Sequence, residues 1–295
     1  MNAESVTLRP SRSSRLIRVR MRWRISWTGL VLGLAGLAVV FLALCAIAPQ
    51  WIAPYSPLVM NVDAILNGPS AGHWLGTDQF GRDVFTIIVY GSRQSLLTGI
   101  GSVLIGGLIG SLIGLLAGYR GGWIDSLFMR LIDVVMSIPG ILLAVSISVA
   151  LGSSQLNVIL AVSVAMIPGY ARVVRGQVIT VKSRPFIDAA RAVGASNTEI
   201  MLRHVLPNCF SPLLVMAAMG IGSSILMGSS LSFLGLGEIG EIPDWGFLLS
   251  QGRSYLTVAW WIATFPGLAI TCLVVAVNVL GDELRDRLDP KSGRR

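Results

Sequence analysis

The chain has 295 residues, of which 53% are hydrophobic and only 13% are charged. Its mean hydropathy is +0.72, which argues against a soluble globular protein and favours a membrane protein. The formal net charge of +8 requires no nucleic acid, because an excess of Lys and Arg at the cytoplasmic face of a membrane protein, attracted to anionic lipid, accounts for it.

Five long segments without Asp, Glu, Lys or Arg predict membrane-spanning helices, at 25–62, 94–119, 134–171, 204–237 and 254–281. A span needs about 20 apolar residues, so each segment holds at least one. The segment 134–171 would form a single helix about 57 Å long, nearly twice the hydrocarbon core, and the turn-forming sequence GSSQLN at 152–157 divides it. We therefore predict an all-α polytopic membrane protein with six transmembrane helices, at 27–48, 95–118, 134–151, 157–172, 212–235 and 257–280.

The segment before the first span is strongly basic. It contains Arg9, Arg12, Arg15, Arg18, Arg20, Arg22 and Arg24. Positive charge near a span marks the cytoplasmic side, and six spans return the C-terminus to that side. All Lys and Arg residues except Arg82, Arg93 and Arg253 are then cytoplasmic. The predicted parts are a basic cytoplasmic tail 1–24, a first transmembrane helix with an external segment 25–93, a five-helix core 94–281, and a cytoplasmic tail 282–295.

The external segment contains HWLGTDQFGRDVFTIIVYGSRQSL from His73. Two interpretations of its apolar end remain open. The side chains Val84, Phe85, Ile87, Ile88 and Tyr90 could lie on the membrane surface as a short helix, or the segment could form a folded cap over the helix bundle.

The second span has a glycine at every fourth position: Gly106, Gly110, Gly114 and Gly118. Glycines at this spacing share one helix face and allow another helix to approach closely. The spacing predicts tight helix packing without identifying the partner helix. Pro139 and Pro168 in the next two spans each remove a backbone donor and can kink a helix.

The connection between the fourth and fifth spans, 173–211, is a polar insert in an apolar chain. Ser183 and Pro185 predict the start of a short helix, and Gly194 predicts its left-handed end. Ser196 and Glu199 form a capping-box pattern for a second short helix, which we expect to stop before Pro207. This unit could dock into a groove of another protein or lie on lipid as an amphipathic loop.

A glycine pattern of the G-x-G-x-x-G type occurs at Gly235, Gly237 and Gly240. A dinucleotide site needs a strand before the pattern and a helix after it. Here a predicted span precedes it and Pro243 follows, so we predict an external loop.

The polar insert resembles the EAA loop of bacterial ABC importer permeases. That family pattern is EAA, three residues, G, nine residues, I, one residue, LP, and this chain has Asp188-Ala189-Ala190, then Gly194, then Leu206-Pro207. Aspartate replaces the glutamate, and His204 stands where isoleucine is usual, which bears on the buried face of the second helix.

The segments from His73 and from Leu231 (LSFLGLGEIGEIPDWGFLL) resemble C-type permease subunits of peptide and nickel importers, the dipeptide/oligopeptide permease family with the type I importer fold. The resemblance implies a permease of the bacterial inner membrane that moves peptides, peptide-like solutes or nickel complexes by alternating access. It also implies a second, related permease as a heterodimer partner, two ATPase subunits that bind ATP and Mg, and an extracytoplasmic substrate-binding protein. The polar insert would form coupling helices seated in a cleft of the ATPase.

The resemblance leads to two sets of candidate contact residues. The ATPase-docking set is Asp188, Ala189, Ala190, Arg191, Gly194, Glu199 and Pro207, with Arg191 a candidate partner for an acid of the ATPase. The candidate outer gate or binding-protein contact is Gly76, Thr77, Asp78, Gly81, Arg82, Asp83, Asp244 and Trp245, for which a purely structural role is the alternative.

Two other function classes have less support. A self-contained secondary transporter or pore usually carries acids or histidines near the membrane midplane, and the uncharged segments contain none except His204, next to the polar insert. An enzyme is disfavoured because no H-E-x-x-H motif is present and His73 and His204 fall on opposite sides of the membrane. The sequence also lacks a G-x-x-x-x-G-K-[ST] phosphate loop, so ATP hydrolysis would belong to another chain. We expect no catalytic residue, metal site or cofactor in this chain.

Overall fold

The computed structural model describes residues 13–238 and 240–288 of the chain, with side chains from Thr28 onward. The predicted terminal tails therefore lie partly outside the described residues, at 1–12 and 289–295. The main helices are α1 (Ser13–Ile47), α2 (Val84–Arg120), α3 (Gly122–Met136), α4 (Gly140–Leu151), α5 (Gln155–Lys182), α6 (Pro185–Ala192), α7 (Asn197–Glu199), α8 (Leu206–Phe233), α9 (Trp245–Arg253) and α10 (Trp261–Leu288). Short helical segments are η1 (Pro49–Trp51), η2 (Val62–Ala64) and the π-helical η3 (Ile200–Val205). The described residues form no strand, and the all-helical prediction is confirmed.

Five helical stretches are long and apolar enough to span a membrane: Thr28–Ile47, Val84–Arg120, Gln155–Lys182, Asn197–Phe233 and Trp261–Leu288. A sixth span exists if α3 and α4 form one crossing, and these two helices meet at an angle of 87°. The predicted start of the third helix at 134 is therefore wrong, whereas the kink predicted at Pro139 is confirmed. Because proline has no backbone donor, the break falls at Ser137–Pro139, whereas Pro168 lies inside the continuous α5.

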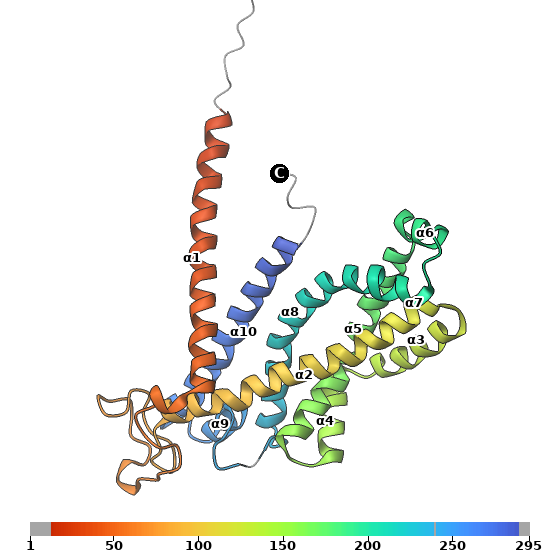
Figure 1. Ribbon diagram of the computed structural model, residues 1–295. Helices are drawn as coiled ribbons and strands as arrows, with labels where there is room; N and C mark the ends of the chain where they lie inside the picture. The colour runs from red at the N-terminus through yellow and green to blue at the C-terminus, as the bar shows by residue number, and fades with distance from the viewer. Residues whose placement is uncertain (1–12, 239, 289–295) are drawn as a thin grey trace, which may run out of the picture.

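The chain crosses from one end of the bundle to the other with each successive span (Figure 1). The first turns of α1, the last turns of α10, and α6 all lie at one end, whereas α9 and the segment between α1 and α2 lie at the other. This arrangement is what six crossings require, and it places the polar insert at the same end as both termini of the described chain.

Helix α2 packs along α5 through its glycine face. A Cβ atom added at Gly106, Gly110, Gly114 or Gly118 would lie 2.6, 2.6, 2.3 or 3.0 Å from the carbonyl oxygens of Ser163, Ile167, Ala171 and Arg175, respectively. Both series advance by four residues in the same direction, so the two helices run parallel with their backbones in contact. The predicted close packing is confirmed, and the structure identifies α5 as the partner.

The start of α2 lies inside the protein. The side chains of Val84, Ile87 and Val89 are buried, and Asp83 accepts a hydrogen bond from the backbone N–H of Thr86 at the helix N-terminus. The interpretation of this segment as a surface helix is therefore wrong, and the folded-cap alternative holds. A 37-residue helix that begins in the cap leaves no separate amphipathic turn to lie on lipid.

Candidate functional site

The first candidate site is the connection between α5 and α8, residues 183–205. Its first helix begins at Pro185 with Arg184 as the capping residue, and the hydroxyl of Ser183 donates instead to the carbonyl of Thr180 at 3.0 Å. The prediction that Ser183 caps this helix is therefore wrong, because Ser183 closes the C-terminal end of α5. The left-handed end is confirmed, since Gly194 has φ of +89° and its N–H donates to the carbonyl of Arg191.

The second helix of the connection differs from its prediction. Ser196 accepts a hydrogen bond from the N–H of Glu199 at 3.2 Å, but the Glu199 carboxylate pairs with Arg203 at 2.6 Å. The chain then runs through η3 into α8 without stopping before Pro207. A proline ring clashes with the carbonyl four residues earlier in an α-helix, and the wider π-helical turn before Pro207 lets the helical chain continue.

The underside of the connection is anchored in an apolar cluster. Ile187, Ile200 and Val205 are fully buried against residues of α2, α5 and α8, and Ala190 is partly buried beside them. His204 lies half-buried with its ring centroid 6.3 Å from that of Phe186. Burying about three aliphatic side chains contributes several kcal/mol, so the connection is a fixed part of the fold.

The outer face of the connection is exposed and carries most of the predicted docking residues. Exposed members are Asp188, Ala189, Arg191, Gly194 and Pro207, and Glu199 is partly buried. Arg191 lies 3.3 Å from Asp188 on its own helix, a pair of low energetic value at this exposure. Val193 beside them is 85% exposed, so this face combines an apolar centre with charged neighbours.

Tyr119, at the end of α2, ties the connection to the bundle, and sequence reasoning missed it. Its hydroxyl donates to the carbonyl of Asn197 at 2.6 Å, and its own carbonyl accepts from Lys182 at 2.5 Å. The two partners are 78 and 63 residues away along the chain, so no local pattern could have indicated these bonds.

We expect Tyr119→Phe to loosen the connection without unfolding the bundle. The substitution keeps the ring and the Lys182 bond and removes only the hydrogen bond to Asn197, which is worth about 1 kcal/mol. Limited proteolysis of the detergent-purified protein should show faster cleavage between 183 and 205. Tyr55→Phe is the matched control, because the Tyr55 hydroxyl donates to the carbonyl of Gly72 at 2.8 Å at the other end of the molecule. Equal cleavage rates in both variants would contradict the prediction.

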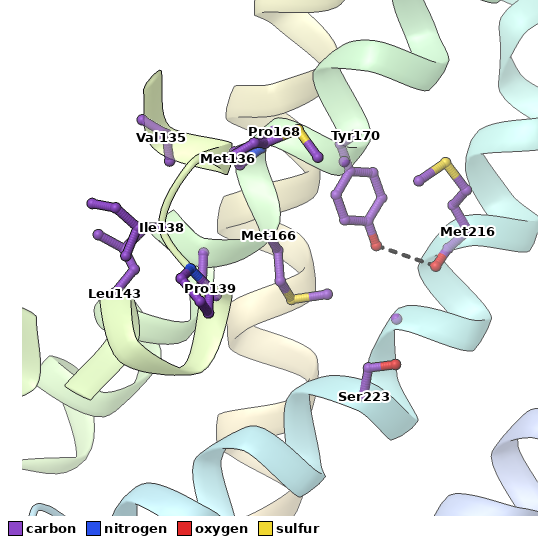
Figure 2. A pocket seen from close by; sticks show the side chains of 14 residues that line it. Val135, Met136, Ile138, Pro139, Leu143, Met166, Pro168, Tyr170, Met216 and Ser223 are labelled. Carbon is purple, nitrogen blue, oxygen red and sulfur yellow. Dashed lines mark hydrogen bonds between the residues drawn. The ribbon is translucent and has the colours of Figure 1, made fainter. Parts of the chain in front are cut away.

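The second candidate site is a cavity of 390 Å³ between the α3–α4 bend, α5 and α8. Figure 2 shows Met166 and Tyr170 extending from α5 toward α8, with Met216 and Ser223 on the facing helix. The Tyr170 hydroxyl donates to the carbonyl of Met216 at 3.2 Å and joins the two helices across the cavity.

The cavity wall has a distinctive chemistry. It contains no charged side chain, but it includes the thioethers of Met136, Met166 and Met216 and the hydroxyls of Tyr170 and Ser223. Thioethers adapt to varied shapes, and hydroxyls can donate and accept hydrogen bonds. Irregular backbone at membrane depth is tolerated where it lines a cavity, which agrees with the helix break beside it.

The predicted outer contact residues form an internal network. Asp78 pairs with Arg82 at 2.7 Å, and Thr77, Asp78, Arg82, Asp83 and Trp245 are all buried. The Trp261 indole donates to the carbonyl of Thr77, and the Trp245 indole donates to the carbonyl of Ile88.

The two glycines of this set are constrained by the backbone around them. Gly76 and Gly81 have positive φ, and a Cβ at Gly81 would lie 1.8 Å from the carbonyl oxygen of Asn61. This burial favours the structural alternative for the set, while its role as a gate or protein contact stays a prediction.

Asp244 caps α9 from the loop after α8. Its carboxylate accepts from the Ser232 hydroxyl at 2.6 Å and from the N–H of Phe247 at 2.8 Å. Burial raises the pKa of Asp244 above its usual value, and these hydrogen bonds oppose the rise. The glycine pattern before it, at Gly235 and Gly237, follows a helix and not a strand, so it has no dinucleotide-site context.

The raised pKa of Asp244 predicts a pH-dependent stability. The folded state holds the Asp244 proton more tightly than the unfolded state does. The contribution of this carboxyl group to the free energy of unfolding therefore falls as pH rises from about 3.8 through the folded pKa. Asp244→Asn should remove that fall while still accepting from Phe247. Thermal unfolding in detergent between pH 4 and 8 tests this: the difference in Tm between variant and parent should shift in favour of the variant as pH rises. Parallel curves would contradict it.

Among the described residues, no group of three or more His, Cys, Asp or Glu side chains is placed to hold a metal ion.

Comparisons with known proteins agree with this architecture. Residues 110–294 match the family model described as "Binding-protein-dependent transport system inner membrane component". The chain is 47% identical over 258 residues to the "Glutathione transport system permease protein GsiD" of Escherichia coli O6:K15:H31 and to that of Shigella boydii serotype 4, covering 87% of this chain and 85% of each relative. A solved structure of the MetNI methionine ABC transporter in an inward-facing conformation has a similar fold, with a TM-score of 0.56 and 20% identity over 70% of this chain and 97% of that one.

Proposed function

Because the chain belongs to the binding-protein-dependent transport system inner membrane component family and is a multi-pass inner-membrane permease of an ABC importer, we propose that it imports peptide-like solutes. The observation that carries this substrate class is the 47% identity to a glutathione transport permease over 87% of the chain. Glutathione is itself a tripeptide, so a short peptide or peptide conjugate is the expected solute.

We propose that the connection 183–205 is the docking site for the ATPase subunits. Its buried underside and exposed outer face support this role, since a rigid unit transmits a displacement to the helix bundle better than a mobile loop does. Asp188, Ala189 and Gly194 lie on the exposed face, where a cleft could receive them. ATP and Mg would be bound by two separate ATPase subunits, and the end of the bundle that carries both termini and α6 would face the cytoplasm.

We further propose that the 390 Å³ cavity is this chain's share of the solute pathway. Its volume lies within the range of small-molecule sites, and its thioethers and hydroxyls suit solutes with amide groups and varied side chains. A second, related permease would supply the facing wall. Alternating access would then change the separation of the α3–α4 bend, α5 and α8 under the control of ATP, and an external binding protein would deliver the solute.

Co-purification and uptake together test this function. The tagged chain, expressed with its native genetic neighbours, is isolated in mild detergent, identified with its partners by mass spectrometry, and reconstituted into vesicles. We expect a second six-span chain and phosphate-loop ATPases, and ATP-dependent uptake of labelled glutathione or dipeptides. ATP-dependent uptake of a nickel complex but no peptide would overturn the substrate class. A chain that purifies alone and conducts solute without ATP would overturn the importer and favour a self-contained transporter or pore.

A further inference from the structure

Two ion pairs join α3 to α5. The guanidinium of Arg175 makes a two-point contact with the carboxylate of Asp125, with Nε 2.5 Å from Oδ1 and Nη2 2.6 Å from Oδ2. One turn earlier on α5, Arg172 lies 2.6 Å from Asp133. Two-point arginine–carboxylate contacts fix orientation as well as distance, so the first pair defines how α3 lies on α5.

These pairs matter because little of α3 is buried within this chain, although α3 also contacts α2, from which a single residue separates it. Of its 15 residues, only Ile132 is buried among the described residues. The exposed fractions of the Arg175 and Asp125 side chains are 32% and 19%, against 48% and 62% for the Arg172–Asp133 pair. The more buried Arg175–Asp125 pair is less screened by solvent and contributes more.

The two ends of this link lead to the two candidate sites. Helix α5 ends at Lys182, and only two residues separate it from Pro185, where α6 of the docking connection begins. Helix α3 ends at Met136, and the bend that follows it lines the cavity through Ile138 and Pro139. A displacement of the docking connection that moved α5 would shift the α5 side of the cavity directly, through Met166 and Tyr170. It would reach the side formed by the α3–α4 bend only as far as α3 follows α5.

We propose that Arg175–Asp125, assisted by Arg172–Asp133, is a positioning pair that makes α3 move with α5 and so carries motion of the docking connection to the side of the cavity formed by the α3–α4 bend. The expected effect on transport rests on the proposed function, whereas the mechanical link between α3 and α5 does not. None of these four residues lines the cavity or lies in the connection, so they act through the bend.

A charge-exchange experiment tests the pair. Asp125→Arg and Arg175→Asp are made singly and together in the chain reconstituted with its native ATPase partners. Each single variant should assemble and hydrolyse ATP but transport at least ten-fold less solute per ATP, since like charges now separate α3 from α5. The exchanged double variant should recover to within about three-fold of the parent. A merely structural role would lower assembly and hydrolysis together and leave the ratio unchanged.

A second readout needs no transport. Ile138→Cys, in a background with Cys45, Cys209 and Cys272 replaced, reports on the bend through its labelling rate with a water-soluble maleimide in the purified chain. The single charge variants should change this rate at least three-fold, and the exchange should restore it. If labelling depends on the pair but the chain reconstituted with its native ATPase partners shows no ATP-driven uptake, the proposed function is refuted. The mechanical link between α3 and α5 is then retained.

The matched control is an ion pair within a single helix, which cannot join two helices. Glu283 and Arg287 pair at 2.6 Å within α10, and Glu283→Arg should leave the solute-to-ATP ratio and the Ile138→Cys labelling unchanged. If a single reversal does not fold, Asp125→Asn with Arg175→Gln, which leaves no unpaired charge, decides the question. Parental ratio and labelling in that variant, or an exchange that assembles without recovering either, would overturn the proposal.

Discussion

Replacing Gly194 by proline is expected to abolish solute uptake while the membrane spans remain folded. Gly194 has φ of +89°, whereas proline holds φ near −65°, so the turn between α6 and α7 cannot form. Proline also removes the N–H that donates to the carbonyl of Arg191. Because the buried residues of the connection flank this turn, its outer face should lose its shape, and ATPase subunits should be lost or hydrolyse ATP without transport. Uptake per reconstituted chain should fall more than ten-fold.

Gly152→Pro is the matched control for this prediction. Gly152 ends α4 with φ of +86°, its N–H donates to the carbonyl of Ser148 at 3.0 Å, and no atom lies within 4 Å of an added Cβ. The local damage is therefore the same as at Gly194, but it falls in the α4–α5 turn, outside the connection. ATPase retention on the purified chain should distinguish the two variants. Normal uptake by Gly194→Pro, or equal loss of the ATPase from both, would refute the role assigned to the connection.

Replacing Gly114 by alanine is expected to cause a large loss of stability from a single methyl group at the α2–α5 contact. The new Cβ would lie 2.3 Å from the carbonyl oxygen of Ala171 and 2.9 Å from the N–H nitrogen of Arg175. Both are backbone atoms of α5, so no side-chain rotation relieves the overlap, and the helices must separate along their shared face. Overpacking of this kind costs about 3 kcal/mol, which corresponds to a fall in Tm of roughly 6–12 °C.

Gly33→Ala in α1 is the control for the stability measurement. No atom lies within 4 Å of a Cβ added there, and alanine favours a helix over glycine. Thermal unfolding of both variants in the same detergent should show a large loss for Gly114→Ala and none for Gly33→Ala. An unchanged Tm for Gly114→Ala would mean that the backbones of α2 and α5 lie farther apart than the structure shows.

Local chemistry explains which predictions the structure confirmed. The left-handed turn at Gly194 and the cap at Ser196 depend on a few neighbouring residues, and both occur where the sequence places them. The α2 glycine face follows from helical periodicity alone. Where a boundary depended on a competing interaction, prediction failed: Ser183 caps the end of α5 instead of the start of α6, and the π-helical turn carried the helix past Pro207.

The largely buried GTDQFGRD segment illustrates a second limit. The sequence left a contact site and a purely structural role open for it, and in the structure Asp78 and Arg82 pair with each other inside the cap. That pair is local, but the segment is also held by contacts with residues far along the chain, such as the Trp261 indole that donates to the carbonyl of Thr77. Local sequence does not reveal contacts of this second kind.

The sequence by itself determined the membrane class, the glycine face and the turn of the polar connection, because each follows from hydropathy or from contacts within a few residues. Only the tertiary structure decided the 87° bend at Pro139, the cavity beside it, the anchor at Tyr119 and the Arg175–Asp125 pair. The anchor and the ion pair join residues 50 or more positions apart, so their energies exist only after the helices have packed. Pro139 predicts a kink, but its size depends on how the neighbouring helices pack.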